Sequence, residues 1–152
     1  MKVITYATLE KHIRQAERML SYVRNLQQTS FQIYDDKWLA ENTSYPEKYP
    51  QIFDTAKGAG LWAWKPIIIE DALQADDTVL YLDASMIPHD HQAIRRIFEG
   101  INDIAVVSDA EWVQRQWCKR DTFIVMGCDE ERFYNAVHIM AGIVFVKRTG
   151  LP

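Results

Sequence analysis

The sequence predicts a three-layer α/β fold with a mostly parallel central sheet in one domain. Its 152 residues suit a single domain with one buried core. Short apolar runs alternate with segments whose apolar residues recur every three or four positions, which indicates alternating strands and amphipathic helices. The run 78–82, T-V-L-Y-L, is apolar enough for a central strand covered on both faces. Such alternation is typical of layered α/β folds with parallel strands.

The first half is expected to contain a strand at 3–7, a helix at 9–28, a strand at 31–34, an irregular segment at 36–50 and a helical turn at 52–57. Thr8 is suited to cap the first helix, because its hydroxyl can accept a hydrogen bond from a first-turn amide. The inward positions of this helix should be Leu9, Ile13, Ala16, Leu20 and Val23. Pro46 and Pro50 indicate the irregular segment.

The second half is expected to contain a helix from Lys65-Pro66 to residue 73, the strand 78–82, a helix at 92–98, a buried strand at 104–107, a short helix at 120–126 and a last strand at 141–146. Proline is tolerated in the first turn of a helix, so Pro66 fits a helix start. The buried strand should end at Ser108-Asp109.

Composition excludes several classes of protein. The net charge of −4 argues against broad nucleic-acid binding, which favours a basic face. No stretch approaches the ~20 apolar residues of a membrane span, and the N-terminal apolar run is too short for a signal peptide. The two cysteines, Cys118 and Cys128, do not make a disulfide framework and are interpreted as free thiols. These features predict a cytoplasmic protein.

Acidic residues follow the expected strands. Ligands of parallel α/β sheets bind beyond the carboxyl ends of the strands. The residues that directly follow the expected strands are Thr8, Asp35-Asp36, Asp83-Ala84-Ser85 and Asp109. Asp83 is placed to meet a divalent cation or a ligand hydroxyl, although aspartate also ends strands for ordinary turn and capping reasons. Asp109 has the same geometry and a weaker case.

The stretch W-A-W-K-P at 62–66 suggests a pocket wall. Lys65 would lie beside the free amides of a helix start, which favours an anion such as phosphate; the alternative is a solvated surface lysine. Trp62 and Trp64 alternate, so one should face the core and one the pocket.

Two further clusters carry open alternatives. Lys119, Arg120 and Asp121 can hold a diphosphate or carboxylate, or form a surface ion-pair cluster, which is the commoner situation. The segment His89-Asp90-His91 lacks the usual spacing of zinc ligands, which favours a loop before a helix that Asp90 caps.

The sequence resembles the N-terminal, donor-binding part of bacterial and viral glycosyltransferases with the nucleotide-sugar (GT-A) fold. The similar stretches are I-T-Y-A-T at 4–8, G-A-G-L-W-A-W-K-P-I-I-I at 58–69, V-L-Y-L-D-A-S at 79–85, W-C-K-R-D-T-F at 117–123 and A-G-I-V-F at 141–145. Such enzymes usually continue past the last of these, so the chain is expected to be a fragment, a minimal form or a donor-binding half.

This resemblance implies a site for the donor. The nucleotide would lie against the first strand, at Thr5, Tyr6, Ala7 and Thr8. Trp64 and Lys65 would approach the diphosphate or donor sugar. The other residues implied at the donor pocket are Asp83, Ala84, Ser85, Asp109, Lys119, Arg120 and Asp121, with Asp83 and Asp109 as the catalytic candidates on the donor side.

The resemblance also raises the question of a metal. Asp83 would hold the first position of a D-x-D-like element that binds Mn²⁺ or Mg²⁺, but Ser85 stands in place of the second carboxylate. A hydroxyl is a weak ligand for a hard cation. Lys65 with Arg120 is the alternative for neutralising the diphosphate.

Three functions are therefore weighed. The first is a hexosyl-type glycosyltransferase that moves a sugar from a nucleoside-diphosphate donor, expected to be a UDP-sugar, to an acceptor hydroxyl. The second is an inactive or truncated module that binds the nucleotide sugar without turnover. The third is an interaction or nucleic-acid protein that stacks bases on W-A-W-K-P, which the acidic balance disfavours.

Overall fold

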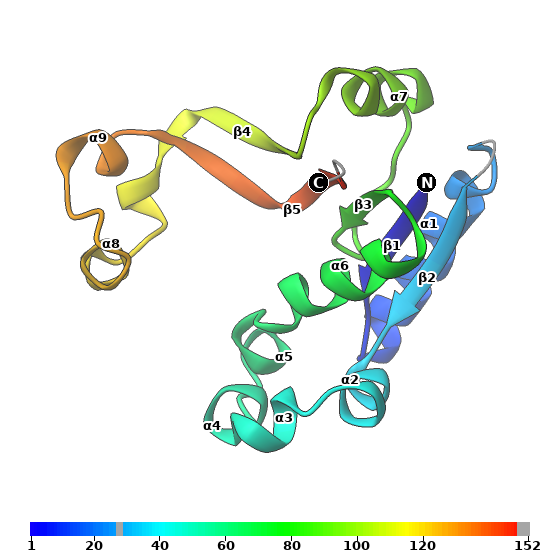
Figure 1. Ribbon diagram of the computed structural model, residues 1–152, viewed down its shortest axis with the longest axis horizontal. Coiled ribbons are helices and arrows are strands. Elements are labelled where there is room, and N and C mark those ends of the chain that lie inside the picture. Colours follow the sequence, from blue (N-terminus) through cyan, green and yellow to red (C-terminus); the bar gives the residue numbers. More distant parts are fainter. Residues whose placement is uncertain (27–28, 149–152) are drawn as a thin grey trace. The chain divides into compact units, whose positions relative to one another are not determined.

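The computed structural model describes residues 1–26 and 29–148, which fall into two compact units (Figure 1). One unit contains the chain up to Ala105 and again from Val144, and the other contains Val106–Ile143. Each is described by itself below. None of the described helices is long and apolar enough to cross a membrane. Both Cys118 and Cys128 are free thiols, as expected.

The strands of the described residues form one five-stranded sheet in the order β2-β1-β3-β5-β4. Their bounds are β1 Lys2–Tyr6, β2 Ser30–Tyr34, β3 Thr78–Leu82, β4 Ile104–Val113 and β5 Val137–Lys147. The first strand, β1, runs parallel to both of its neighbours, with Val3 opposite Phe31 on β2 and Leu80 on β3. The expected α/β fold with a mostly parallel sheet is confirmed.

The helices of the first unit are α1 Glu10–Val23, α2 Asp36–Asn42, α3 Tyr45–Lys48, α4 Pro50–Phe53, α5 Gly58–Leu61, α6 Trp64–Ala75 and α7 His91–Gly100. Those of the second are η1 Gln114–Gln116, α8 Arg120–Val125 and α9 Glu131–Tyr134. The expected starts of α6 and α7 agree with the structure to within one residue, and Asp90 caps α7 by accepting from the Ala93 amide at 2.8 Å.

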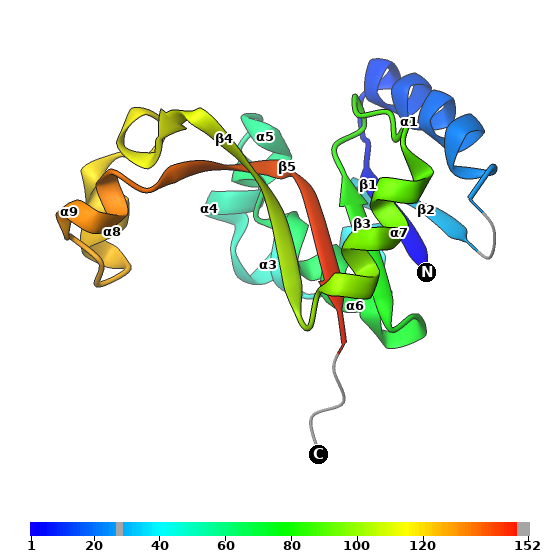
Figure 2. The same ribbon diagram turned by 90° about the horizontal axis from the view of Figure 1, so that it is seen from above.

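Helices cover both faces of the parallel strands. Ile4 and Tyr81 belong to a buried cluster with Ile68 of α6. Strand residues alternate between the two faces of a sheet. Val3 and Leu80, which precede Ile4 and Tyr81 in their strands, therefore point to the opposite face, and both are fully buried as well. On that side α1 lies along β1 and β2 (Figure 2). The fold therefore has three layers, with α6 and α1 on opposite faces of the sheet.

The segment 36–50 is not irregular, contrary to expectation. It forms α2 and α3, and α4 begins at its end. The Asp35 carboxylate accepts from the Trp38 amide at 2.7 Å and caps α2. Pro46 and Pro50 lie in the first turns of α3 and α4, where a missing N–H breaks no helical hydrogen bond. The two prolines therefore begin helices here.

The expected cap and length of α1 are wrong, although its start agrees to within one residue. Leu9, not Thr8, occupies the N-cap position, and no side chain caps the helix. The helix ends at Val23; residues 27–28 of the expected range lie outside the described part of the chain. Leu9 and Ile13 are exposed, whereas Met19 is buried. The inward stripe is therefore shifted toward the end of the helix.

The strand expected at 104–107 is longer and more exposed. It continues to Val113, and Ile104 is 63% exposed. Asp109 consequently lies within β4 and does not follow a strand end. Its carboxylate accepts from the Glu111 amide at 3.0 Å.

Residues 58–62 form a turn of the opposite hand to an ordinary helix, here called the left-handed turn. All five have positive φ, from 47° at Ala59 to 88° at Gly60. The Leu61 amide donates to the Lys57 carbonyl and the Trp62 amide to the Gly58 carbonyl, which is the spacing of an α-helical turn. L-residues pay about 1–2 kcal/mol each for this conformation, so the turn needs support from its surroundings.

Packing gives that support. The Trp64 indole N–H donates to the Gly58 carbonyl at 3.0 Å, and buried Gly60 packs against Phe53. A Cβ on Gly58 would come within 2.5 Å of the Trp62 ring. Glycine at 58 therefore allows both the backbone conformation and the position of that ring.

We expect Gly58→Ala to lower the free energy of unfolding by about 1–3 kcal/mol more than Gly127→Ala. Gly127 also has positive φ, but a Cβ there meets nothing within 4 Å, so it isolates the backbone strain from the contact with Trp62. Urea unfolding measures the difference. The indole N–H resonance of Trp62 should shift only in Gly58→Ala. Equal losses with an unmoved resonance would contradict the position of the ring.

Candidate functional site

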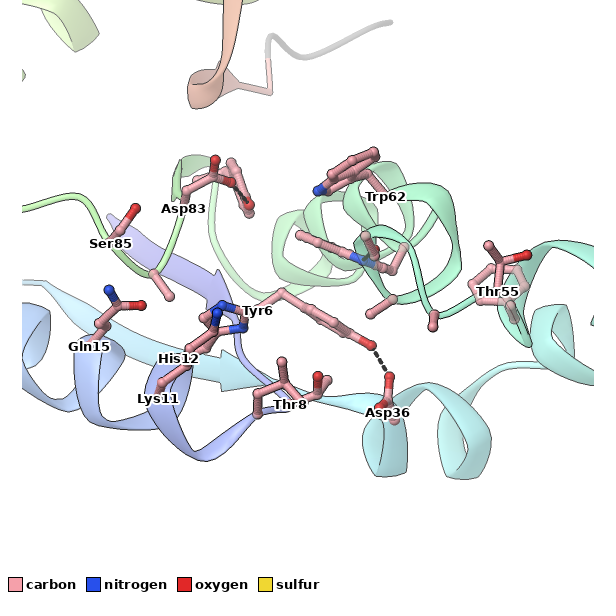
Figure 3. Close-up of a pocket in the computed structure, with 18 of the residues that line it drawn as sticks. Tyr6, Thr8, Lys11, His12, Gln15, Asp36, Thr55, Trp62, Asp83 and Ser85 are labelled. Carbon is pink, nitrogen blue, oxygen red and sulfur yellow. Dashed lines mark hydrogen bonds between the residues drawn. The ribbon is translucent and has the colours of Figure 1, made fainter.

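A cavity of about 700 Å³ opens in the first unit at the carboxyl ends of β1 and β3 (Figure 3). Four parts of the chain line it: the ends of the two strands, the beginning of α1, the start of α2, and the segment from Phe53 through the left-handed turn to Trp64. This is the edge at which parallel α/β sheets bind ligands.

Stacked aromatic rings build part of the cavity lining. Tyr6 of β1 lies flat on Trp64 of α6, with ring centroids 4.0 Å apart and planes 11° apart. Tyr81 of β3 is tilted against Trp64 at 6.0 Å. Trp64 is only 5% exposed, so this arrangement ties the two strands to the start of α6.

Trp62 provides a more accessible aromatic surface. It also lines the cavity and is 50% exposed, ten times the exposed fraction of Trp64. One tryptophan was expected in the core and one on the pocket wall. In the structure both line the cavity, and they differ only in how much of each is exposed. Trp62 can stack on a planar or sugar ring.

The Tyr6 hydroxyl links β1 to α2. It donates to the Asp36 carboxylate, and both residues line the cavity. Burial raises the pKa of Tyr6, and the hydrogen bond and negative charge of Asp36 raise it further. Tyr6 therefore stays a neutral donor.

Asp83 sits among three groups at the end of β3. The Tyr81 hydroxyl donates to its Oδ1, and the Lys65 ammonium lies 3.4 Å from the same atom. Lys65 also lies 4.6 Å from the centre of the Tyr81 ring. Burial, then the charge and hydrogen bond of Asp83, raises the pKa of Tyr81. Tyr81 and Lys65 together hold the carboxylate in place.

Asp83 faces the cavity and Lys65 stands behind it. The Asp83 side chain is 42% exposed and lines the cavity, whereas the Lys65 side chain is 14% exposed and is not among the lining residues. Two residues that the resemblance implies at the donor pocket are therefore in contact. Their contact is with each other, and only Asp83 presents its polar atoms to the space.

The first turns of α1 form a wall that sequence reasoning did not identify. Lys11, His12 and Gln15 line the cavity and extend toward the side on which Ser85 lies (Figure 3). A usable signal existed, because the helix after the first strand must begin at the same edge of the sheet. Asp54 and Thr55, which follow α4, line another part and were also missed.

The residues implied by the resemblance fall into three groups. Those that line the cavity are Tyr6, Thr8, Trp64, Asp83, Ala84 and Ser85. Thr5 and Ala7 are buried beside them and, like Lys65, are not lining residues. The roles of all these residues in binding stay predictions.

The remaining implied residues, Asp109, Lys119, Arg120 and Asp121, belong to the second unit. There Arg120 makes two hydrogen bonds to Asp129, at 3.1 and 3.0 Å, and the Tyr134 hydroxyl donates to the same carboxylate. The hydrogen bonds from Arg120 lower the pKa of Asp129, and those to Asp129 raise the pKa of Arg120. Arg120 therefore takes part in a surface ion pair, which is the alternative to binding a diphosphate or carboxylate.

The side chains around Asp83 fit a divalent cation poorly. Hard cations favour several oxygen ligands. Within residues 1–26 and 29–148, no three His, Cys, Asp or Glu side chains gather as a metal-binding group. A cation at Asp83 would also have to displace the Lys65 ammonium. Use of Mn²⁺ or Mg²⁺ stays a prediction, and no step below depends on it.

Comparison with known proteins supports the fold. No family model matches the chain, and neither does any curated protein. Among solved structures, the chain is similar to the galactosyltransferase LgtC, whose structure was solved with donor and acceptor sugar analogues. The match has a TM-score of 0.58 and 13% identity and covers 97% of this chain and 58% of that one. The chain therefore has the fold of a GT-A glycosyltransferase and spans about 58% of the length of this relative.

Proposed function

We propose that the cavity binds a nucleoside-diphosphate sugar, with UDP-sugar as the first candidate, and that the protein transfers the sugar to an acceptor hydroxyl. The observation that carries the proposal is the position of the cavity. It lies at the carboxyl ends of β1 and β3 in a glycosyltransferase fold, and its lining combines stacked aromatic rings with the Asp83 carboxylate.

Each part of the lining suits one part of such a donor. Tyr6 and Thr8, at the end of β1, would lie against the nucleoside, for which Trp62 offers a half-exposed ring to stack on. The Asp83 carboxylate, fixed by Tyr81 and Lys65, would accept a hydrogen bond from a hydroxyl of the sugar. Transfer also requires stabilisation of the departing diphosphate by positioned charges.

A second candidate is a module that binds the donor without turnover. It is favoured by Ser85, which stands where the resembling enzymes carry a second carboxylate, and by the engagement of the Asp83 carboxylate with Lys65 and Tyr81. Binding and turnover must therefore be measured separately.

We expect Asp83→Asn to weaken binding of UDP-galactose and UDP-glucose about 10- to 100-fold, because a charged acceptor of a sugar hydroxyl is lost. Binding of UDP in the presence of a chelator should change much less, since UDP lacks the sugar. Titration calorimetry of both ligands, with and without Mn²⁺, measures the effect.

The matched control is Glu99→Gln, which removes an exposed carboxylate from α7 without touching the cavity lining. It should leave every affinity unchanged. Unaltered binding of both ligands in Asp83→Asn, with and without metal, would show that the donor does not lie at the end of β3. Loss of Mn²⁺-dependent binding of UDP itself would instead make Asp83 a metal ligand.

If the protein is a transferase, wild-type protein should release UDP from the donor that it binds, faster with a suitable acceptor sugar than with water. A coupled assay for free UDP measures this release. Tight binding of UDP-sugars without released UDP, across a panel of mono- and disaccharide acceptors, would favour the binding module.

A further inference from the structure

A bound diphosphate needs cations or donors, and the structure indicates which ones are available. We infer that Lys11 and His12 of α1 form the diphosphate-binding wall of the cavity, while Lys65 positions Asp83. This inference rests on the proposed function for the identity of the ligand. The anion-binding wall itself can be tested without a nucleotide.

The Lys65 ammonium already contacts an acidic side chain of the protein. Its ammonium lies 3.4 Å from Asp83 Oδ1 and over the face of Tyr81, and its side chain is 14% exposed. A phosphate that took this ammonium as a partner would break the contact with Asp83. The lysine at the helix start therefore acts through the carboxylate that it holds.

The Arg120 guanidinium also has an acidic partner. Its guanidinium makes a two-point contact with Asp129 within the second unit. An exposed pair of this kind is worth little to stability. It nevertheless uses the planar fork that an arginine would present to a phosphate.

Lys11 and His12 differ from both of these residues. They line the cavity, and among residues 1–26 and 29–148 no hydrogen-bonding or ion-pair partner is found for either side chain. Figure 3 shows both extending from α1 into the same part of the cavity as Gln15. An ammonium group brings three donors, and an imidazole brings one or two. Together they are suited to phosphate oxygens.

Neutral donors complete this wall. The Gln15 amide and the hydroxyls of Thr8 and Ser85 line the same cavity. Of the acids in the lining, Asp83 is paired with Lys65, whereas Asp36 accepts from the neutral Tyr6 hydroxyl and keeps its negative charge, and Asp54 is a third acid. Beside α1 the lining therefore brings together Lys11, His12 and neutral donors, and Asp36 lies on the side away from Gln15 and Ser85 (Figure 3).

The test is a titration of ¹⁵N-labelled protein with inorganic pyrophosphate and, separately, with UDP, both in a chelator. A chain of 17.7 kDa is well suited to observation of every backbone amide. We expect both ligands to shift amides at the start of α1 and near Ser85. Lys11→Gln should weaken pyrophosphate binding about tenfold, and Lys11→Gln with His12→Gln about 100-fold.

Arg18→Gln is the control, because it removes an exposed cation from α1 outside the cavity. It should leave both affinities within about twofold, as surface charges away from the ligand contribute little. The same spectra report whether each variant is folded. Since Lys11 is exposed, a dispersed spectrum is expected for Lys11→Gln alone even if the double variant is unstable.

The outcomes separate the inference from the proposed function. Unchanged pyrophosphate binding in folded Lys11→Gln overturns the inference, as does loss of binding in Lys65→Gln but not in Lys11→Gln. Lys11-dependent pyrophosphate binding without any UDP binding supports the inference and overturns the choice of a uridine donor. Binding of neither ligand by wild-type protein overturns both.

Discussion

The stacking of Tyr6 on Trp64 is the contact on which the rest of the site depends. It joins the last residue of β1 to the first residue of α6, which are far apart in the sequence. Trp64 then donates to the Gly58 carbonyl, and Tyr6 donates to Asp36. One pair of rings thus connects a strand end, the left-handed turn and α2. Aromatic pairs of this geometry contribute about 0.5–1.5 kcal/mol beyond the area that they bury.

The same contact explains how a helix start can serve as a pocket wall. Trp64 is held between Tyr6 and Tyr81, so the next residue, Lys65, is directed toward the end of β3. There it meets Asp83. The position of the carboxylate is therefore determined by packing as much as by its place after a strand. A lysine on a freely solvated helix would not hold it in this way.

Local sequence patterns predict an element correctly where one feature, such as an apolar run or a capping side chain, is enough to determine it. Strand β3 is apolar on both faces and was placed at its observed bounds, and Asp90 caps α7 as expected. The segment 36–50 was misjudged because proline both interrupts helices and begins them, and local sequence does not say which applies. For β4, an apolar run indicated burial, yet Ile104 is exposed, because burial depends on neighbours that a single strand does not reveal.

The rule about strand ends predicts the position of Asp83 and Thr8, and both line the cavity; their roles in binding stay predictions. The α1 wall was not predicted, because Lys11 and His12 have the composition of any solvated helix face. Their significance appears only when β1 places the start of α1 beside the end of β3. The left-handed turn was equally hidden. The two glycines indicate a break in the helical pattern, but they do not indicate that Ala59 and Trp62 also have positive φ.

That reversed turn has a consequence for how the gene can vary. Every base change that replaces glycine introduces a Cβ. At position 58 such an atom would come within 2.5 Å of an indole ring, and at position 60 within 3.1 Å of the Phe53 backbone. A Cβ at position 58 requires Trp62 to move and one at position 60 requires Phe53 to give way, both at positive φ, so lineages that keep this cavity should keep both glycines.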